Sequence, residues 1–321
     1  MRTLSFMFKS GLAALAIAAA ASPAPALAGY PDKPVTMIVP YPPGGGTDSV
    51  ARALAARLTE RWGRTVLVQN ISGADGLIGA KHVLAQPHDG YTMLFQIPQM
   101  LLWHWTMPEA KVEILKDFRM VSRINQTPMT VAVHPAFPAD SMKELVQYCR
   151  AHPCSVGTAT TLGTMIGKQL MEELGVDNAI YVPYRGGGPM MTDLLGRQVT
   201  LGLAAGGTAL AQVRNKQLKV LAVTSKNRFK LMPDTPTLKE LGYGVEMVTW
   251  YGMMVPKDTP AEAFDAIAKA VRSVSDDATL LESIEANGAE PVFDTPAEFQ
   301  AEVESELKVL GPLIQKYPPT N

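Results

Sequence analysis

Short apolar runs alternate with segments of helical period along the first hundred residues. Val35–Val39 is a β-branched apolar run bounded by prolines, which predicts a buried strand. Within Ser49–Trp62, apolar residues recur at helical spacing until Gly63, which predicts a helix that ends there. Further runs at Thr65–Asn70 and Thr92–Ile97 predict two more strands, separated by a short helix. This order predicts a parallel sheet with right-handed crossovers.

A second series of strands and helices follows. Apolar runs predict strands at Met129–His134, Ser155–Thr160, Ala179–Tyr184, Val199–Ala205, Leu218–Thr224 and Val248–Val255. The pattern after the last strand is helical, and Thr-Pro-Ala-Glu occurs twice, from Thr259 and from Thr295. Each copy predicts a helix start with the threonine as N-cap. Two α/β units in one chain predict a cleft between two lobes.

The glycine-rich stretch Pro42–Asp48 joins the first predicted strand to the first predicted helix. Its three glycines leave backbone N–H groups open to approach, and Thr47 or Asp48 is placed to cap the helix. Such groups at a helix start favour a bound anion. The segment lacks the lysine of a P-loop, and Ser49 stands where a dinucleotide fingerprint needs its third glycine. The alternative interpretation is a plain strand-to-helix turn.

Four more loops rich in glycine or hydroxyl residues follow predicted strands. They are Ser72–Gly76, Thr158–Thr164, Tyr184–Gly188 and Ala204–Thr208. In open α/β sheets, ligands bind outside the carboxyl ends of the strands. Five such loops facing one cleft favour a bound anion over the plain turn.

The first residues have the pattern of a secretory leader. Met1–Ala28 combines Arg2 and Lys9, an apolar stretch too short to span a membrane, and a small-x-small site before Gly29. We therefore expect a periplasmic protein, cleaved after Ala28, with no direct membrane insertion afterwards.

Charge and cysteine usage narrow the function classes. The chain has 29 Lys and Arg and 30 Asp and Glu, so loss of Arg2 and Lys9 with the leader leaves 27 basic residues and a net charge of −3. This balance argues against nucleic acid or an anionic membrane surface as partner.

Cys149 and Cys154 are the two cysteines, and a local disulfide or two unpaired thiols are both open. They cannot form a structural zinc site alone.

Short motifs are spread over nearly the whole mature chain. In order, they are Tyr30–Pro34, Pro40–Asp48, Asn70–Ala80, Asp89–Thr92, Val182–Pro189, Thr192–Gly196, Leu221–Ser225, Pro233–Thr237, Trp250–Gly252 and Thr259–Pro260. In these motifs the chain resembles the Bug family, the periplasmic solute-binding receptors of tripartite tricarboxylate transporters. Each motif is weak alone, and together they are specific.

The resemblance implies an α/β fold of the type II periplasmic binding-protein class, a Venus flytrap whose lobes are mostly parallel sheets flanked by helices. Residues 29–123 with 249–321 would form lobe 1 and residues 124–248 lobe 2. The chain would cross near Arg123–Thr127 and near Gly242–Val248. Two pincer loops, Gly44–Asp48 and Thr160–Thr164, would hold a ligand carboxylate with backbone amides and hydroxyl groups.

From the loops and the resemblance together we expect a set of ligand-binding residues and no catalytic or metal-binding residue. The set is Tyr41, Pro43, Gly44, Gly45, Gly46, Thr47, Asp48, Gly73, Ala74, Gln96, Thr160, Thr161, Gly163, Thr164, Arg185, Gly206 and Trp250. Arg185 would pair either with the ligand or with an acidic neighbour. Asp48 would be a helix cap or a water-mediated ligand contact. We expect no cofactor.

The chain departs from the family pattern at two places. The second-lobe loop lacks the histidine that family members often carry, and Gln96–Trp105 is apolar and aromatic where they often have Thr, Ser, His and Asn. Met100, Leu102, Trp103 and Trp105 either face the cleft or pack in the core or hinge. If they face the cleft, the ligand is a carboxylate with an aromatic or aliphatic body.

Three functions remain from the sequence. The first is a monomeric receptor that passes a small carboxylate to the permease subunits of a tripartite tricarboxylate transporter. The second is a ligand-presenting periplasmic sensor component for a receptor kinase, which the sequence does not separate from the first. The third is an exported α/β enzyme acting on an anionic substrate. The chain contains no zincin pair and no Gly-x-Ser-x-Gly elbow, so we expect no enzyme.

Overall fold

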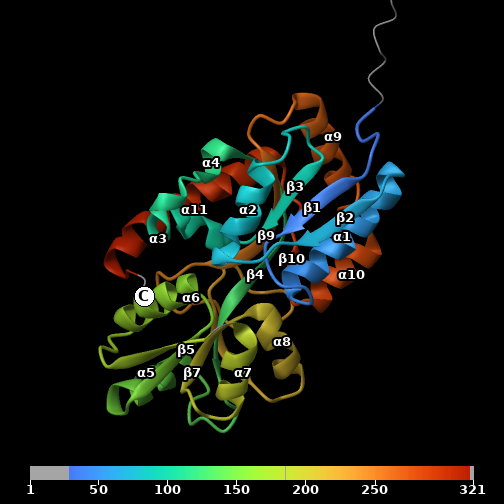
Figure 1. The fold of residues 1–321 in the computed structure, drawn as a ribbon. Coiled ribbons are helices and arrows are strands. Elements are labelled where there is room, and N and C mark those ends of the chain that lie inside the picture. The colour runs from blue at the N-terminus through green and yellow to red at the C-terminus, as the bar shows by residue number, and fades with distance from the viewer. Residues whose placement is uncertain (1–28, 185, 319–321) are drawn as a thin grey trace, which may run out of the picture.

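A computed structural model describes residues 29–184 and 186–318 of the chain. The predicted leader Met1–Ala28 and Arg185 lie outside the described residues. In Figure 1 the molecule has an upper and a lower part, each built of strands covered by helices. Among the residues described, no helix combines the length and apolarity needed to cross a membrane.

One run of strands connects the two parts. Its order is β2 (Val66–Asn70), β1 (Val35–Val39), β3 (Thr92–Gln96), β9 (Val248–Pro256), β4 (Phe118–Val133), β7 (Leu201–Ala205), β5 (Cys154–Thr158) and β6 (Ala179–Pro183). The strands β8 (Lys219–Val223) and β10 (Glu290–Pro291) also pair with β4. The pairs of β1 with β2 and β3, and of β5 with β6 and β7, are parallel as predicted. The central strands β4 and β9 are antiparallel to their neighbours, so the sheet is mixed.

The long strand β4 belongs to both parts of the molecule. Its first residues pair with β9 from Phe118 to Pro128, and it continues beside β7 from Met129. The sequence predicts only the end of this strand, because the polar residues of Ser122–Gln126 interrupt the apolar run. The predicted crossing at Arg123–Thr127 lies inside β4, and the predicted crossing at Gly242–Val248 leads into β9. The exact boundaries of the two lobes stay a prediction.

The helices cover both faces of the strands (Figure 1). The upper part has α1 (Gly46–Trp62), α2 (Leu77–Leu84), α3 (Trp103–Thr106), α4 (Ile114–Asp117), α9 (Ala261–Arg272), α10 (Ala278–Ala286), α11 (Pro296–Lys316) and the 3-10 turns η1 (Ala74–Gly76), η2 (Pro98–Leu102) and η3 (Pro108–Ala110). The lower part has α5 (Met142–Ala151), α6 (Thr161–Glu173), α7 (Gly187–Leu195) and α8 (Gly206–Arg214). Apolar side chains of α1, α9 and α10 pack with β1 and β3 in one buried cluster, which stabilises the upper part.

Two helix starts differ from their predictions. The helix α1 begins at Gly46 with Gly45 as N-cap, so neither Thr47 nor Asp48 caps it. The N-cap of α9 is Pro260 rather than Thr259, whose buried hydroxyl has no partner among the described atoms. By contrast, Thr295 forms the predicted capping box with Glu298 at the start of α11.

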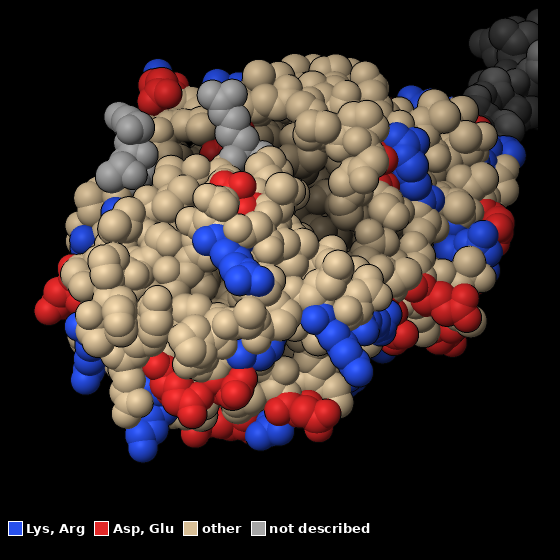
Figure 2. Space-filling view, turned by 90° about the horizontal axis from the view of Figure 1, so that it is seen from below, with Lys and Arg blue, Asp and Glu red and all other residues tan. Residues whose placement is uncertain are grey.

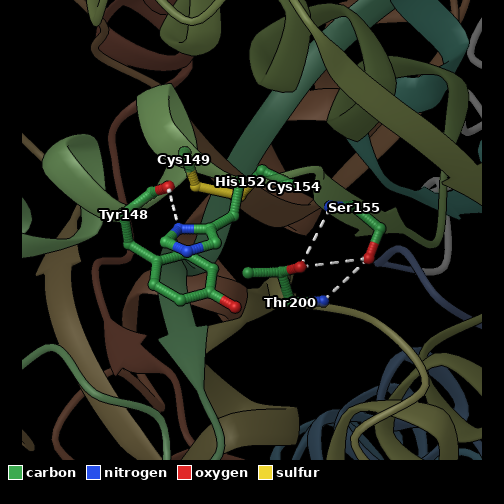
Figure 3. Close-up of a disulfide and its surroundings, with 6 residues drawn as sticks. All are labelled: Tyr148, Cys149, His152, Cys154, Ser155 and Thr200. Carbon is green, nitrogen blue, oxygen red and sulfur yellow. Dashed lines mark hydrogen bonds between the residues drawn. A yellow bond between two sulfur atoms is a disulfide. The ribbon is translucent and has the colours of Figure 1, made fainter.

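A disulfide joins Cys149 to Cys154, which selects one of the two interpretations left open by the sequence (Figure 3). It links the end of α5 to the start of β5. Beside it, the backbone N–H of Ser155 donates to the Thr200 hydroxyl at 3.0 Å, which ties the strand to the segment before β7. The disulfide therefore stabilises the lower edge of the lower part. It lies away from the loops that follow the strands of that part.

Besides the strand pairing, several contacts join the two parts, and two of them involve the helices α8 and α6. At the first, α8 meets the loop after α10 backbone to backbone: a Cβ built on Gly207 would lie 2.2 Å from the carbonyl oxygen of Asn287. The Thr127 hydroxyl donates to the adjacent Gly288 carbonyl at 2.9 Å. At the second contact, Lys316 and Tyr317 at the end of α11 bind the carboxylate of Glu172 on α6.

Candidate functional site

The first helix starts in a loop whose geometry is fixed by buried Asp48. The Asp48 carboxylate accepts the Gly44 N–H at 3.0 Å, the Arg52 guanidinium at 2.9 Å and the Asn70 amide at 2.9 Å. Burial alone would raise the pKa of Asp48, but these hydrogen bonds outweigh it and hold the pKa below its usual range. The protein itself occupies this carboxylate, so Asp48 shapes the loop.

The same loop leaves no room for a side chain at Gly46. A Cβ there would lie 2.7 Å from the hydroxyl oxygen of Tyr251. Tyr251 is held by its neighbour Thr47, and burial raises the pKa of its hydroxyl. The predicted residues Gly44–Asp48 thus form a rigid turn against β9, and none of them lies on the wall of either cavity described below.

A second tight loop, Gly73–Gly76, precedes α2. Ala74 and Asp75 have φ angles of 45° and 50°, which side chains other than glycine rarely adopt. Gly76 has φ 89°, and a Cβ on it would lie 2.5 Å from Nε2 of Gln96. Asp75 lines a cavity, and its carboxylate accepts the side-chain amide of Gln99 at 3.4 Å.

Buried polar side chains hold that loop in place. The Tyr41 hydroxyl donates to Oε1 of Gln96 at 2.5 Å, and burial raises the pKa of Tyr41. Trp103 donates from its ring N–H to the Asp75 carbonyl at 3.2 Å. Tyr41 and Gln96 therefore stabilise the conformation of the Gly73–Gly76 loop, which contains Asp75. Among the described atoms Nε2 of Gln96 has no hydrogen-bond partner.

The facing element is the start of α6 in the other part of the molecule. Thr160 is its N-cap, and the Thr160 hydroxyl accepts the Gly163 N–H at 3.0 Å. The hydroxyls of Thr158 and Thr164 lie 2.7 Å apart. The N–H groups of the first helical turn have no partner within the helix and carry its positive dipole end.

A cavity of about 420 Å³ lies between these two elements. It is lined by Asp75, Ala159, Thr160, Thr161, Thr164, Met165, Lys168, Pro183, Tyr184, Gly186, Tyr317 and Pro318. Lys168 is the one cation among the described lining residues, and its Nζ lies 3.5 Å from the Pro318 carbonyl oxygen. Burial raises the pKa of Tyr184 to about 12, and its hydroxyl donates to Asp193 at 2.7 Å.

The face of the protein seen from below is hollowed near its centre. Figure 2 shows that most of the surface around this hollow is neither acidic nor basic. On this face Lys and Arg are interspersed with Asp and Glu and form no continuous positive patch. Within the described residues, no group of His, Cys, Asp and Glu could hold a metal ion.

The structure brings together only part of the predicted ligand set. Thr160, Thr161 and Thr164 lie on the wall of the 420 Å³ cavity. The predicted Trp250 does not: it is fully buried, and its ring N–H donates to Glu306 on α11 at 3.0 Å. Side chains alternate along a strand, so Trp250 faces α11 whereas Tyr251 faces the Gly46 turn. Gly206 is also buried, packed against Thr127 and away from both cavities.

Sequence reasoning missed several lining residues. Lys168 follows Thr161 and Thr164 on one face of α6, so helical spacing alone could have identified it. Asp75 lies inside a loop selected for its glycines. Tyr317 comes from the far end of the chain, and no local pattern signals its approach to α6.

The aromatic stretch after β3 packs in the core. Met100, Leu102 and Trp103 are fully buried in the main cluster, and Trp105 packs against it. Of the two interpretations left open by the sequence, the structure supports packing. The apolar cleft lining after β3 comes instead from Ile97 and Pro98.

Two α/β lobes joined by continuous strands, with a ligand-sized cavity between facing loops, define a periplasmic binding protein of the type II class. A family model described as "Tripartite tricarboxylate transporter family receptor" matches residues 50–318. The chain belongs to this family, which is a family of receptors rather than of enzymes.

Relatives and solved structures agree with this assignment. Protein BugT of Bordetella pertussis is 33% identical over 285 residues, which are 87% of each chain. The structure of the periplasmic binding protein BugD is 34% identical with a TM-score of 0.76, over 90% of this chain and 99% of that one. A structure from R. palustris with adipate is 29% identical with a TM-score of 0.78, over 89% of this chain and 97% of that one.

Proposed function

We propose that this chain is a periplasmic receptor that captures a small organic carboxylate between its lobes and delivers it to the permease of a tripartite tricarboxylate transporter. The observation that carries the proposal is the start of α6, where three threonines and Lys168 line the cavity that faces the Asp75 loop. Membership of the receptor family and the adipate-bound relative support it.

The chemistry of this wall suits a carboxylate head. The Gly163 N–H is taken by the Thr160 hydroxyl, so the N–H groups of Thr161 and Leu162 and the dipole of a 13-residue helix are what favour a negative group there. The hydroxyl of Thr161 adds a neutral donor, the Thr164 hydroxyl already donates to the Thr160 carbonyl, and Lys168 adds one positive charge. We place the ligand carboxylate at this helix start, held as in the predicted second pincer loop.

Closure of the lobes would complete the site. In the proposed mechanism the first predicted pincer loop, Gly44–Asp48, approaches the ligand only when the lobes close, which is why it lies off the cavity wall here. A ligand that contacts both lobes binds the closed form better and shifts the population toward it. The closed form is then the form that the permease would recognise.

Export is part of the same proposal. The leader Met1–Ala28 would be cleaved to leave Gly29 as the first residue. Intact-mass measurement of protein recovered from the periplasm tests this, and an uncleaved chain in the cytoplasm would contradict it.

Isothermal titration of the mature protein, refolded to remove any co-purified ligand, tests binding. The panel holds mono-, di- and tricarboxylates, and the matched variants are Lys168→Met and Lys143→Met, the second on exposed α5. A hydrogen bond to a charged group contributes about 1.5–3 kcal/mol, so Lys168→Met should weaken binding at least about tenfold. Lys143→Met should leave it unchanged. Absence of binding to every carboxylate would refute the proposal.

A further inference from the structure

A second, smaller cavity adjoins the first and differs from it in chemistry. It has a volume of about 170 Å³ and shares Ala159, Thr160 and Gly186 with the 420 Å³ cavity. Its apolar wall comes from both parts of the molecule, from Ile97, Pro98, Met129, Met190, Leu203 and Met247. None of the described residues that line it carries a charge.

Because the two cavities share part of their wall, one elongated ligand can extend from the first cavity into the second. Thr160 caps the helix whose start would hold the carboxylate head, and the same residue borders the apolar cavity. A ligand with its head at α6 therefore has its body directed past Thr160 into the apolar space. The body then contacts Ile97 and Pro98 of one lobe and Met129 of the other.

The apolar cavity would penalise a second charge. Moving an ionised carboxylate into surroundings without a charged partner costs far more than moving a neutral polar group. In the larger cavity Asp75 is also a lining residue, and Lys168 is the one cation among the lining residues that the structure describes. One ligand carboxylate is thus accommodated at the start of α6, and a second would lie among mostly apolar residues with no further cation among those described.

We propose that the preferred ligand is a monocarboxylate with an uncharged apolar body. This inference rests on the proposed function and narrows it, and it separates this chain from the 29% identical relative whose structure contains adipate, a dicarboxylate. The apolar wall includes the methionines Met129, Met190 and Met247, whose flexible thioether side chains adapt to bodies of different shape.

Two probes of equal chain length test the inference directly. Hexanoate and adipate differ only at the far end, which is a methyl group in one and a carboxylate in the other. Titration of the refolded mature protein should give hexanoate an affinity at least tenfold higher than adipate. Hexanamide, which has the same body without the negative head, should bind at least tenfold more weakly than hexanoate.

Two variants alter the apolar cavity itself. Thr208→Val removes one of its hydroxyl groups at nearly constant volume and should strengthen hexanoate binding two- to fivefold. Met247→Lys lies in the segment before β9 and adds a cation to the wall. It should weaken hexanoate and bring adipate to equal or higher affinity. Far-UV circular dichroism and unfolding midpoints confirm that each variant is folded, and Thr208→Val tests the inference if Met247→Lys is not.

The outcomes separate this inference from the proposed function. Adipate or a tricarboxylate binding as tightly as hexanoate would overturn the apolar-body inference while a carboxylate receptor stands. Hexanamide binding as tightly as hexanoate would overturn the carboxylate receptor itself. A hexanoate preference that Thr208→Val increases and Met247→Lys reverses would establish the monocarboxylate class.

Discussion

Replacing Glu306 with glutamine should remove a loss of stability that the native protein shows as the pH rises from about 4.5 to about 8. Glu306 lies on α11, in a groove of about 310 Å³ that also contains Glu246 and Glu302. It accepts the ring N–H of buried Trp250 at 3.0 Å. Burial, with a smaller contribution from the nearby charge of Glu302, raises the pKa of Glu306 to about 8 against the opposing effects of the Trp250 hydrogen bond and the charge of Arg123.

The sign and size follow from proton linkage. The folded protein keeps the Glu306 proton up to about pH 8, whereas the unfolded chain releases it near 4.5. Between these values the native state binds one more proton, so stability falls as pH rises, by about 1.4 kcal/mol per pH unit at most. The stabilisation that the protonated Glu306 side chain gives to the folded state is complete below about pH 4.5 and lost above about pH 8. Its upper limit is roughly 5 kcal/mol, and water in the groove reduces it to about 2–4 kcal/mol.

Urea unfolding at half-unit steps from pH 5 to pH 9 measures the effect. Glu306→Gln resembles the protonated acid in shape and still accepts the Trp250 N–H, so it should match the native protein at pH 5 and exceed it at pH 9. Glu304→Gln on the same helix, where the carboxylate accepts only Gln300 among the described residues, is the matched control. Parallel curves for Glu306→Gln and the native protein over the whole range would refute the reasoning.

Three further changes test the loops and the disulfide. Asp48→Ala should destabilise the protein by about 1–3 kcal/mol and weaken carboxylate binding about tenfold without unfolding it, since it frees the Gly44 turn; unchanged affinity by calorimetry would contradict this. Gly46→Ala should cost about 1–3 kcal/mol in urea unfolding because its Cβ meets the Tyr251 hydroxyl, and Tyr251→Phe should recover part of that loss; an additive double variant would count against the clash. Replacing Cys149 and Cys154 by serine should lower unfolding stability by about 2 kcal/mol and leave ligand affinity unchanged, and a large change in affinity would show that the disulfide supports the cleft.

Most of the strands and helices could be predicted because apolar periodicity is a local signal. The strands β1, β2 and β3 lie within one residue of their predicted bounds. The missed first half of β4 shows the limit: Ser122 and Asn125 are polar yet buried, and Oδ1 of Asn125 accepts the backbone N–H of Tyr251, which is distant in the sequence. Only the folded neighbours reveal that this segment is a central strand.

The candidate site was harder to predict for the same reason. The threonines at the start of α6 follow from local capping chemistry, and the structure places them on the cavity wall. Trp250 and Tyr251 are adjacent aromatic residues, and the sequence does not say which face of β9 meets the cleft. Asp48 lies in the right loop, but its carboxylate is occupied by Arg52, four residues later on the same helix, and by Asn70, a contact that no local pattern shows.

The backbone contact between Gly207 and the Asn287–Gly288 turn is a point about which the two lobes would pivot when they close. A methyl group on Gly207 would lie 2.2 Å from a carbonyl oxygen across the contact and would wedge the lobes apart. Gly207→Ala should therefore lower the affinity for every ligand by the same factor, since it changes the geometry of closure and not the chemistry of the cleft. If small-angle scattering shows an unchanged radius of gyration for Gly207→Ala, the added methyl group does not separate the lobes. If the radius does increase, the position with the largest effect on binding affinity is one that no ligand contacts.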